Sequence, residues 1–183
     1  MGGHVLDALV ARHANIRVLV RHRHPDSAFA GTVTQVVADL RDEQTLRTAL
    51  AGVRAALYIS PHDTDEEELA ANFVRAAEAT GTRIAFAGVH LPARSIAGRL
   101  QLAVTKAFLP SYRGKLRIGQ RIAASQTDPV IFSPTNFFQN DEIVEAEIHN
   151  GTFPLPIRYA NRVDVRDLAE LCARIERLDN GGT

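Results

Sequence analysis

The sequence has one cysteine among its 183 residues, no net charge and no long apolar run. A single cysteine, Cys172, excludes an intrachain disulfide and any metal site built from several cysteines. Since 21 basic residues balance 21 acidic ones, bulk charge does not predict binding to nucleic acid or to an anionic membrane. Neither a membrane span nor a signal peptide is recognisable. We therefore expect a cytoplasmic protein whose partners are small molecules or other proteins.

Lysine is also scarce, because only Lys106 and Lys115 accompany 19 arginines. Each lysine therefore merits attention as a candidate for chemistry. Two histidines, His22 and His24, are spaced like metal ligands, but no third ligand lies nearby in the sequence, so no metal site is predicted. The length fits one domain over residues 1–183.

The chain opens on an amphipathic helix, predicted over residues 3–13, with no strand before it. Strands and helices then alternate, joined by short connections. The predicted strands span residues 16–20, 33–37, 55–60, 83–88 and 130–133. The predicted helices span residues 43–51, 65–80, 112–125 and 164–178, with two less distinct ones around 100–108 and 137–148. This alternation predicts an α/β fold, a Rossmann-like doubly wound parallel sheet with helices on both faces that lacks its first strand.

Several helix boundaries carry capping signals. Thr64 or Asp63 is suited to begin the helix at 65, Asp164 the last helix, and Asp39 the helix at 43. Gly81 is placed to end the long helix over 65–80. Ligands of such sheets bind at the carboxyl ends of the strands, so the residues just after each strand are the candidates for function.

Six segments in order along the chain resemble the NmrA-like family, a branch of the atypical short-chain dehydrogenase/reductases that binds NAD(P) on a Rossmann fold. They are Gly2–Leu6, Val18–Arg21, Asp39–Leu40, Asn72–Ala77, Pro134–Asn140 and Val163–Asp167. The family's fingerprint is G-x-x-G-x-x-G, and this chain keeps only Gly2, at the position of its third glycine. Family members usually continue beyond Thr183 into a substrate-binding part. The resemblance therefore implies a chain that is incomplete at both ends.

The resemblance also implies a dinucleotide site. Gly2 and Gly3 would let the backbone approach a pyrophosphate at the helix N-terminus, or would simply form a loose terminus. Arg21, helped by Arg23, would pair with the 2′-phosphate of NADP, which predicts NADP(H) in preference to NAD(H); a solvated basic loop is the alternative. The remaining implied contacts are Asp39 and Leu40 beside the adenine, and Ser60, Pro61, Gly88, Pro134, Asn136 and Phe137 toward the nicotinamide.

Catalysis in short-chain dehydrogenases needs a Tyr with a Lys four residues later, and a Ser after the fifth strand. Here Tyr112 and Lys115 are three residues apart, Ser111 stands where the Tyr would be, and Gly88 and Val89 replace the usual serines. Lys115 could still contact the nicotinamide ribose or relay a proton, or it could be an ordinary surface lysine. The sequence thus favours an NADPH-dependent oxidoreductase acting on a small quinone or carbonyl acceptor. The alternative is a non-catalytic NADP(H)-binding redox sensor that acts through a regulatory protein partner.

Overall fold

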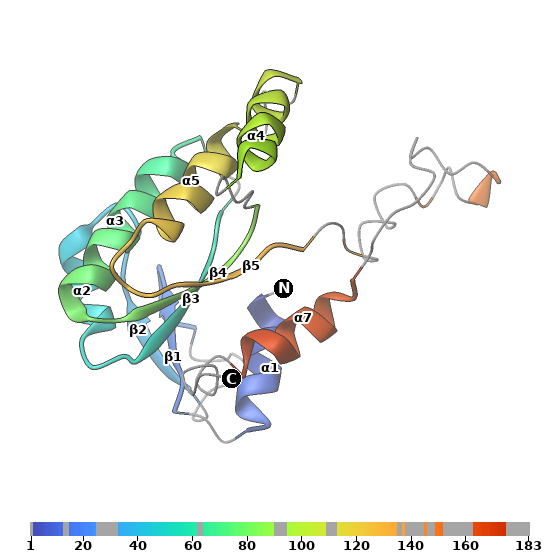
Figure 1. Ribbon diagram of the computed structural model, residues 1–183. Helices are drawn as coiled ribbons and strands as arrows, with labels where there is room; N and C mark the ends of the chain where they lie inside the picture. The colour runs from blue at the N-terminus through green and yellow to red at the C-terminus, as the bar shows by residue number, and fades with distance from the viewer. Residues whose placement is uncertain are drawn as a thin grey trace, which may run out of the picture.

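The computed structural model describes residues 2–12, 15–24, 33–61, 64–89, 95–108, 113–134, 137, 145, 149–151 and 163–174. Helices and strands alternate along most of this chain (Figure 1). In order they are α1 (Gly2–Val10), β1 (Arg17–Val20), β2 (Thr34–Val37), α2 (Glu43–Leu50), β3 (Ala55–Ile59), α3 (Glu66–Thr80), β4 (Arg83–Ala87), α4 (Ile96–Phe108), α5 (Arg113–Ala123), β5 (Val130–Phe132) and α7 (Val165–Cys172).

All strand pairs in the described chain are parallel, as the alternation predicted. β1 pairs with β2, and β3, β4 and β5 pair in that order. The strands thus form two separate sheets, because no ladder among the described residues joins β1 to β3. This division agrees with the expectation of a Rossmann-like sheet that lacks its first strand.

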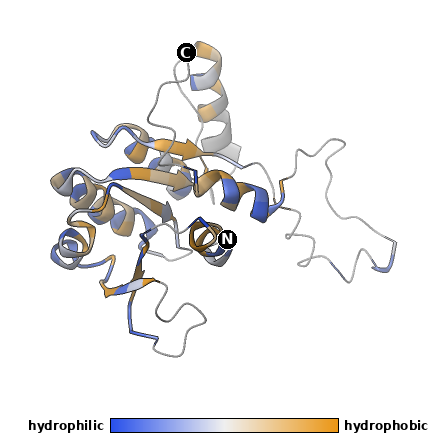
Figure 2. Ribbon diagram, turned by 90° about the horizontal axis from the view of Figure 1, so that it is seen from below, coloured by the Kyte–Doolittle hydropathy of each residue, from blue (hydrophilic) through white to orange (hydrophobic). Residues whose placement is uncertain are grey.

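Helices cover both faces of the strands, which confirms the predicted layering. Figure 1 shows α2, α3 and α5 on one face and α1 with α7 on the other. Apolar residues gather on the strands and on the helix sides turned toward them (Figure 2). The first face holds a core in which Leu46, Leu50, Phe73, Phe86 and Ile122 are buried.

The second core lies under α1 and α7. Val5 of α1, Phe132 of β5, and Leu168 and Cys172 of α7 pack there against the other side of the same strands. Burying apolar side chains on both faces is what a parallel sheet requires. Cys172 is therefore a packing residue.

Two of the predicted helix caps are wrong and two are confirmed. Asp42, not Asp39, caps α2, because its carboxylate accepts hydrogen bonds from the N–H groups of Gln44 and Thr45. Asp65 precedes α3 and makes no capping hydrogen bond, while the Thr64 hydroxyl bonds to the Asp65 side chain; Asp63 lies outside the described residues. Asp164 caps α7, and Gly81 ends α3 with a left-handed φ of 68°.

The predicted helix over 137–148 is wrong at its first residue. Phe137 forms an isolated parallel β-bridge with Val163, and its side chain packs against the second core. The pairing with Val163 brings the Phe137 ring against the second core, where it is partly buried. Local helix propensity carries no information about such a contact with a distant segment. No helix in the described ranges is both long enough and apolar enough to cross a membrane.

Candidate active site at the carboxyl ends of the strands

The carboxyl ends of β3, β4 and β5 lie side by side. Ile59 pairs with Ala87 in the first ladder, and Ala87 pairs with Phe132 in the second. Just beyond them, the Gly88 N–H donates to the Phe132 carbonyl oxygen at 3.0 Å. Ser60, Gly88 and Ser133, which follow these strands directly, therefore line one edge, where ligands of parallel sheets bind.

A serine, a carboxylate and a lysine meet at this edge. The Ser60 hydroxyl donates to Glu66 Oε2 at 3.2 Å, and Lys115 Nζ lies 3.6 Å from the same oxygen. The Glu66 and Lys115 side chains are 15% and 25% exposed, so solvent screens their attraction only in part. Glu66 thus connects Ser60 and Lys115, two candidate site residues that are distant in the sequence. The sequence analysis did not predict Glu66. The sequence signal for Glu66 was the run of acidic residues in the first turn of α3, which is the next helix after β3.

Tyr58 lies beneath this cluster. Its ring packs against Phe73 and Phe86, with centroids 4.8 Å and 6.2 Å away. The hydroxyl is buried and has no hydrogen-bond partner among the described residues. Burial, and secondarily the Glu66 charge, raise the pKa of Tyr58, while the Ser60 hydroxyl, which is near the phenol but makes no hydrogen bond of acceptable geometry with it, lowers the pKa. Tyr58 is therefore held as a neutral phenol near the charged pair.

Two glycines near the edge are fixed by close contacts. A Cβ at Gly114 would lie 2.9 Å from Glu66 Oε1, so a larger residue at 114 would displace the carboxylate. A Cβ at Gly88 would lie 2.2 Å from the Phe86 ring. Packing against Phe86 therefore accounts for Gly88, which the resemblance assigned to the cofactor.

The residues expected beside the adenine and its phosphate follow β1 and β2. Arg21 and Arg23 are exposed in the turn after β1, and the side-chain amide of Gln35 exchanges two hydrogen bonds with the His24 backbone, which fixes this turn onto β2. Asp39 is half-buried, and its carboxylate accepts from the Arg41 N–H at 2.9 Å.

The backbone of the neighbouring Leu40, between β2 and α2, is bonded to α3. Its carbonyl oxygen accepts a hydrogen bond from the buried Asn72 amide of α3 at 3.0 Å. The Leu40 side chain packs against the first core, and the backbones of Asp39 and Leu40 are held by Thr45 of α2 and Asn72 of α3.

The remaining predicted positions are scattered or undescribed. Gly2 and Gly3 form the first turn of α1, and nothing lies within 4 Å of where a Cβ would stand. Pro61 and Pro134 are half-buried just after β3 and β5. Tyr112 and Asn136 lie outside the described residues.

The sequence profile of a protein family described as NAD(P)H-binding matches residues 1–176. The chain belongs to this NAD(P)H-binding family. The predicted resemblance to an NAD(P)-binding family is thereby confirmed. No curated protein matches the chain.

Solved structures with the same fold include several reductases. The triphenylmethane reductase of Citrobacter sp., in complex with NADP(H), is 23% identical, with a TM-score of 0.74 over 99% of this chain and 62% of its own. The NADPH-dependent quinone oxidoreductase of Escherichia coli is 22% identical, with a TM-score of 0.71 and the same coverage. The anaerobilin reductase ChuY of Escherichia coli O157:H7 is 19% identical, with a TM-score of 0.64 over 100% of this chain and 86% of its own. The chain thus spans 62% of the length of the first two proteins.

The described residues of this NAD(P)H-binding chain suit a dinucleotide. The first turn of the nine-residue helix α1 offers backbone N–H groups of the kind that bind a pyrophosphate, and nothing lies within 4 Å of where a Cβ on Gly2 or Gly3 would stand. Two exposed guanidinium groups, of Arg21 and Arg23, and the Lys115 ammonium add positive charge beside the strands. Within the described ranges no three potential metal ligands gather, so His22 and His24 have no third partner there.

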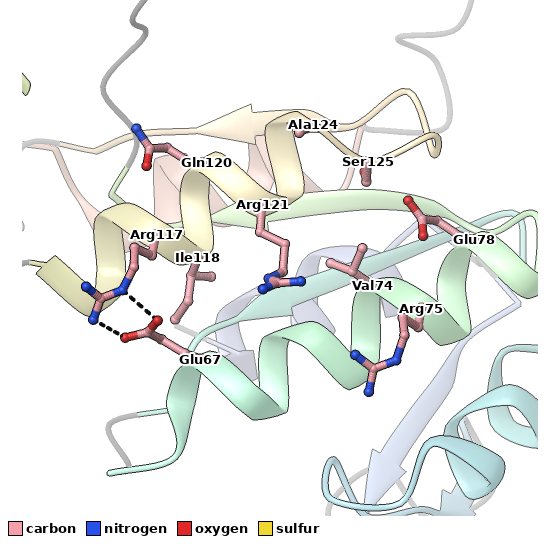
Figure 3. A pocket seen from close by; sticks show the side chains of 10 residues that line it. All are labelled: Glu67, Val74, Arg75, Glu78, Arg117, Ile118, Gln120, Arg121, Ala124 and Ser125. Carbon is pink, nitrogen blue, oxygen red and sulfur yellow. Dashed lines mark hydrogen bonds and ion pairs between the residues drawn. The ribbon is translucent and has the colours of Figure 1, made fainter. Parts of the chain in front are cut away.

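A shallow groove on the outer side of α3 and α5 contains none of the predicted site residues (Figure 3). The carboxylate of Glu67 crosses it and accepts two hydrogen bonds from Arg117, at 2.6 Å and 2.5 Å. The hydrogen bonds from the Arg117 side chain are the main reason that the pKa of Glu67 is lowered. The groove is a solvated ion-pair surface, and the candidate site remains the strand edge.

Proposed function

We propose that the chain is an NADPH-dependent oxidoreductase that passes a hydride to a small quinone or carbonyl acceptor. The observation that carries this proposal is the Lys115 ammonium, held beside Ser60 at the carboxyl end of β3 in a chain of an NAD(P)H-binding family. The reductases of similar fold, one acting on quinones and one on triphenylmethane dyes by name, support the choice of reaction.

Each part of the edge has a role in this proposal. Gly2 and Gly3 bind the pyrophosphate through the N–H groups of α1, and Arg21 with Arg23 binds the 2′-phosphate. Lys115 contacts the nicotinamide ribose and can hold a proton at Nζ for the reduced acceptor. NADPH, when bound, supplies the hydride, so that hydride plus proton complete a two-electron reduction. Ser60, Pro61, Gly88, Pro134 and Phe137 line the remaining space.

The preference for NADPH is tested by Arg21→Ala. A charge-assisted hydrogen bond to phosphate contributes about 1.5–3 kcal/mol, and solvent exposure of Arg21 places the effect at the lower end. We therefore expect the Kd for NADPH to rise about 10–30-fold, with the Kd for NADH unchanged. The control is Arg47→Ala, which removes an exposed arginine of α2 that pairs with Glu43. Equal weakening of both nucleotides by Arg21→Ala would contradict the assignment.

Turnover is tested by mixing the protein with NADPH and a panel of quinones and carbonyl compounds while following the absorbance of the reduced nicotinamide. Oxidation of NADPH that Lys115→Ala abolishes supports the proposal. Tight NADPH binding without oxidation by any acceptor would instead support a redox sensor that acts through a protein partner. A chain that binds neither nucleotide would refute both.

A further inference from the structure

Glu66 occupies the centre of the candidate site, although neither the sequence pattern nor the proposed chemistry assigns it a role. One of its oxygens, Oε2, accepts from Ser60 and faces Lys115 Nζ, at 3.2 Å and 3.6 Å. Its side chain is 15% exposed, the lower value of the pair. A carboxylate this enclosed loses much of its hydration, and its polar contacts must compensate.

The other oxygen of Glu66, Oε1, lies against the first turn of α5. A Cβ on Gly114 would stand 2.9 Å from it, and Lys115 is the next residue of that turn. A negative charge at a helix N-terminus is favoured by the helix dipole. The carboxylate is therefore fixed from three sides, by a strand end, by a helix start and by the lysine.

We propose that Glu66 is a positioning residue that holds the Lys115 ammonium at the carboxyl end of β3 in one orientation. Lysine has a flexible four-carbon side chain, so an unguided ammonium loses more conformational freedom when it meets a ligand. Glu66 removes that loss before the dinucleotide binds and itself touches neither the dinucleotide nor the acceptor. This inference rests on the proposed function, in which Lys115 contacts the nicotinamide ribose.

The chain offers a matched control in the next residue. Glu67 also lies in the first turn of α3 and also pairs with α5, through Arg117, but it faces the outer groove (Figure 3). Glu67→Gln therefore removes an ion pair between the same two helices without touching the strand edge. Any effect of Glu66→Gln that comes only from loosening α3 against α5 should appear in Glu67→Gln as well.

A first experiment needs no cofactor. Reductive methylation with isotope-labelled formaldehyde labels both lysines and the N-terminal amine and keeps their charge, and the NMR signal that is lost in a Lys115→Arg variant is that of Lys115. We expect the Lys115 signal to be shifted and broadened in the parent protein, and to change clearly in position and width in Glu66→Gln but not in Glu67→Gln. A Lys115 signal that is the same in all three proteins would overturn the proposal.

A second experiment measures NADPH affinity and turnover. We expect Glu66→Gln to raise the Kd and the KM for NADPH about 3–30-fold, and the double variant with Lys115→Ala to be no weaker than Lys115→Ala alone. Glu66→Asp should restore part of the affinity. Gly114→Ala, which keeps both charged residues but displaces the carboxylate, should act in the same direction as Glu66→Gln.

The outcomes separate this inference from the proposed function. If Lys115→Ala weakens binding while Glu66→Gln behaves like Glu67→Gln, the positioning role is wrong and the function stands. Effects of Glu66→Gln and Lys115→Ala that multiply in the double variant would also overturn it. If Lys115→Ala leaves NADPH affinity and turnover intact, the proposed role of Lys115 fails, and the positioning role fails with it, even where the NMR signal of Lys115 responds as expected.

Discussion

Replacing Tyr58 by phenylalanine should leave the protein as stable as before, or make it more stable, at neutral pH. The Tyr58 side chain is 3% exposed, and its hydroxyl has no hydrogen-bond partner among the described residues. An unsatisfied buried hydroxyl costs about 1–3 kcal/mol, whereas phenylalanine keeps the ring contacts with Phe73 and Phe86. We expect the free energy of unfolding to rise by between zero and about 2 kcal/mol.

The same substitution should change how stability depends on pH. Burial, followed by the Glu66 charge, raises the pKa of Tyr58 above the ordinary value of about 10. The unfolded chain therefore releases this proton at a lower pH than the folded chain does. The stability linked to the group is complete below about pH 10 and is lost as the pH rises further toward the folded pKa.

The size of this loss follows from the ordinary phenol pKa. If the folded phenol stays protonated, the parent protein loses about 0.8 kcal/mol at pH 10.5 and about 1.4 kcal/mol at pH 11. Tyr58→Phe has no such loss. The advantage of the variant over the parent should therefore grow by these amounts above its value at neutral pH.

Urea unfolding of both proteins, at neutral pH and in steps between about pH 9 and about pH 11, measures the difference. Taking the difference cancels every other group that titrates in this range. Phe73→Leu is the control, since it loosens the same cluster and should lower stability equally at each pH. A difference that stays flat to about pH 11, or a Tyr58→Phe variant less stable than the parent by more than about 1 kcal/mol at neutral pH, would refute the reasoning.

Two further predictions concern the scaffold. Asp42→Ala should lower the free energy of unfolding by about 0.5–2 kcal/mol, because α2 loses its N-terminal cap, whereas Asp42→Asn should cost less; chemical denaturation measures both, and an unchanged stability in Asp42→Ala would contradict the assigned cap. Cys172 should react slowly with a thiol reagent at neutral pH, because burial raises its pKa to about 11. Mass spectrometry should show full labelling only after denaturant is added, and rapid labelling of the folded protein would count against this packing.

The parallel pairing and the helices on both faces followed from the sequence because they depend on local patterns. A short apolar run such as 55–60, stopped by Pro61, is typical of a buried parallel strand. The structure places β3 at Ala55–Ile59 accordingly. The helix face of α3 was equally clear, since Leu69 and Phe73 recur at helical spacing and are buried.

Two of the predicted caps, and the first residue of the helix predicted over 137–148, were wrong because several local solutions are nearly equal there. Asp39 and Asp42 both precede α2, and a carboxylate suits either place. Only the backbone geometry shows that Asp42 reaches the helix N–H groups while Asp39 bonds to the turn at Arg41. Phe137 was read as helical because its pairing with Val163 joins distant parts of the chain.

The candidate site could be predicted only in part for the same reason. Residues after strand ends were found by topology, but Glu66 was not, because its partners Ser60 and Lys115 come from a strand and from another helix. Gly88, which the resemblance assigns to the cofactor, also has a structural reason to be glycine, because a Cβ there would meet the Phe86 ring. Glycine in a sequence does not show whether a ligand or a neighbouring residue requires the space.

Two adjacent carboxylates in the first turn of α3, those of Glu66 and Glu67, lie in different environments. Consecutive helical residues point about 100° apart, so Glu66 turns toward the strand edge and Glu67 toward solvent, and both meet α5, at Lys115 and Arg117. The outer pair has the shorter contacts, yet water and salt screen it, so it contributes little to stability. The inner pair is longer but enclosed, and the field it creates persists at the strand edge. A charged ligand at that edge is therefore affected more by the Glu66–Lys115 pair than by the Glu67–Arg117 pair, although the first has the longer contact. The solvent exposure of an ion pair is thus a better guide to informative substitutions than the distance between its atoms.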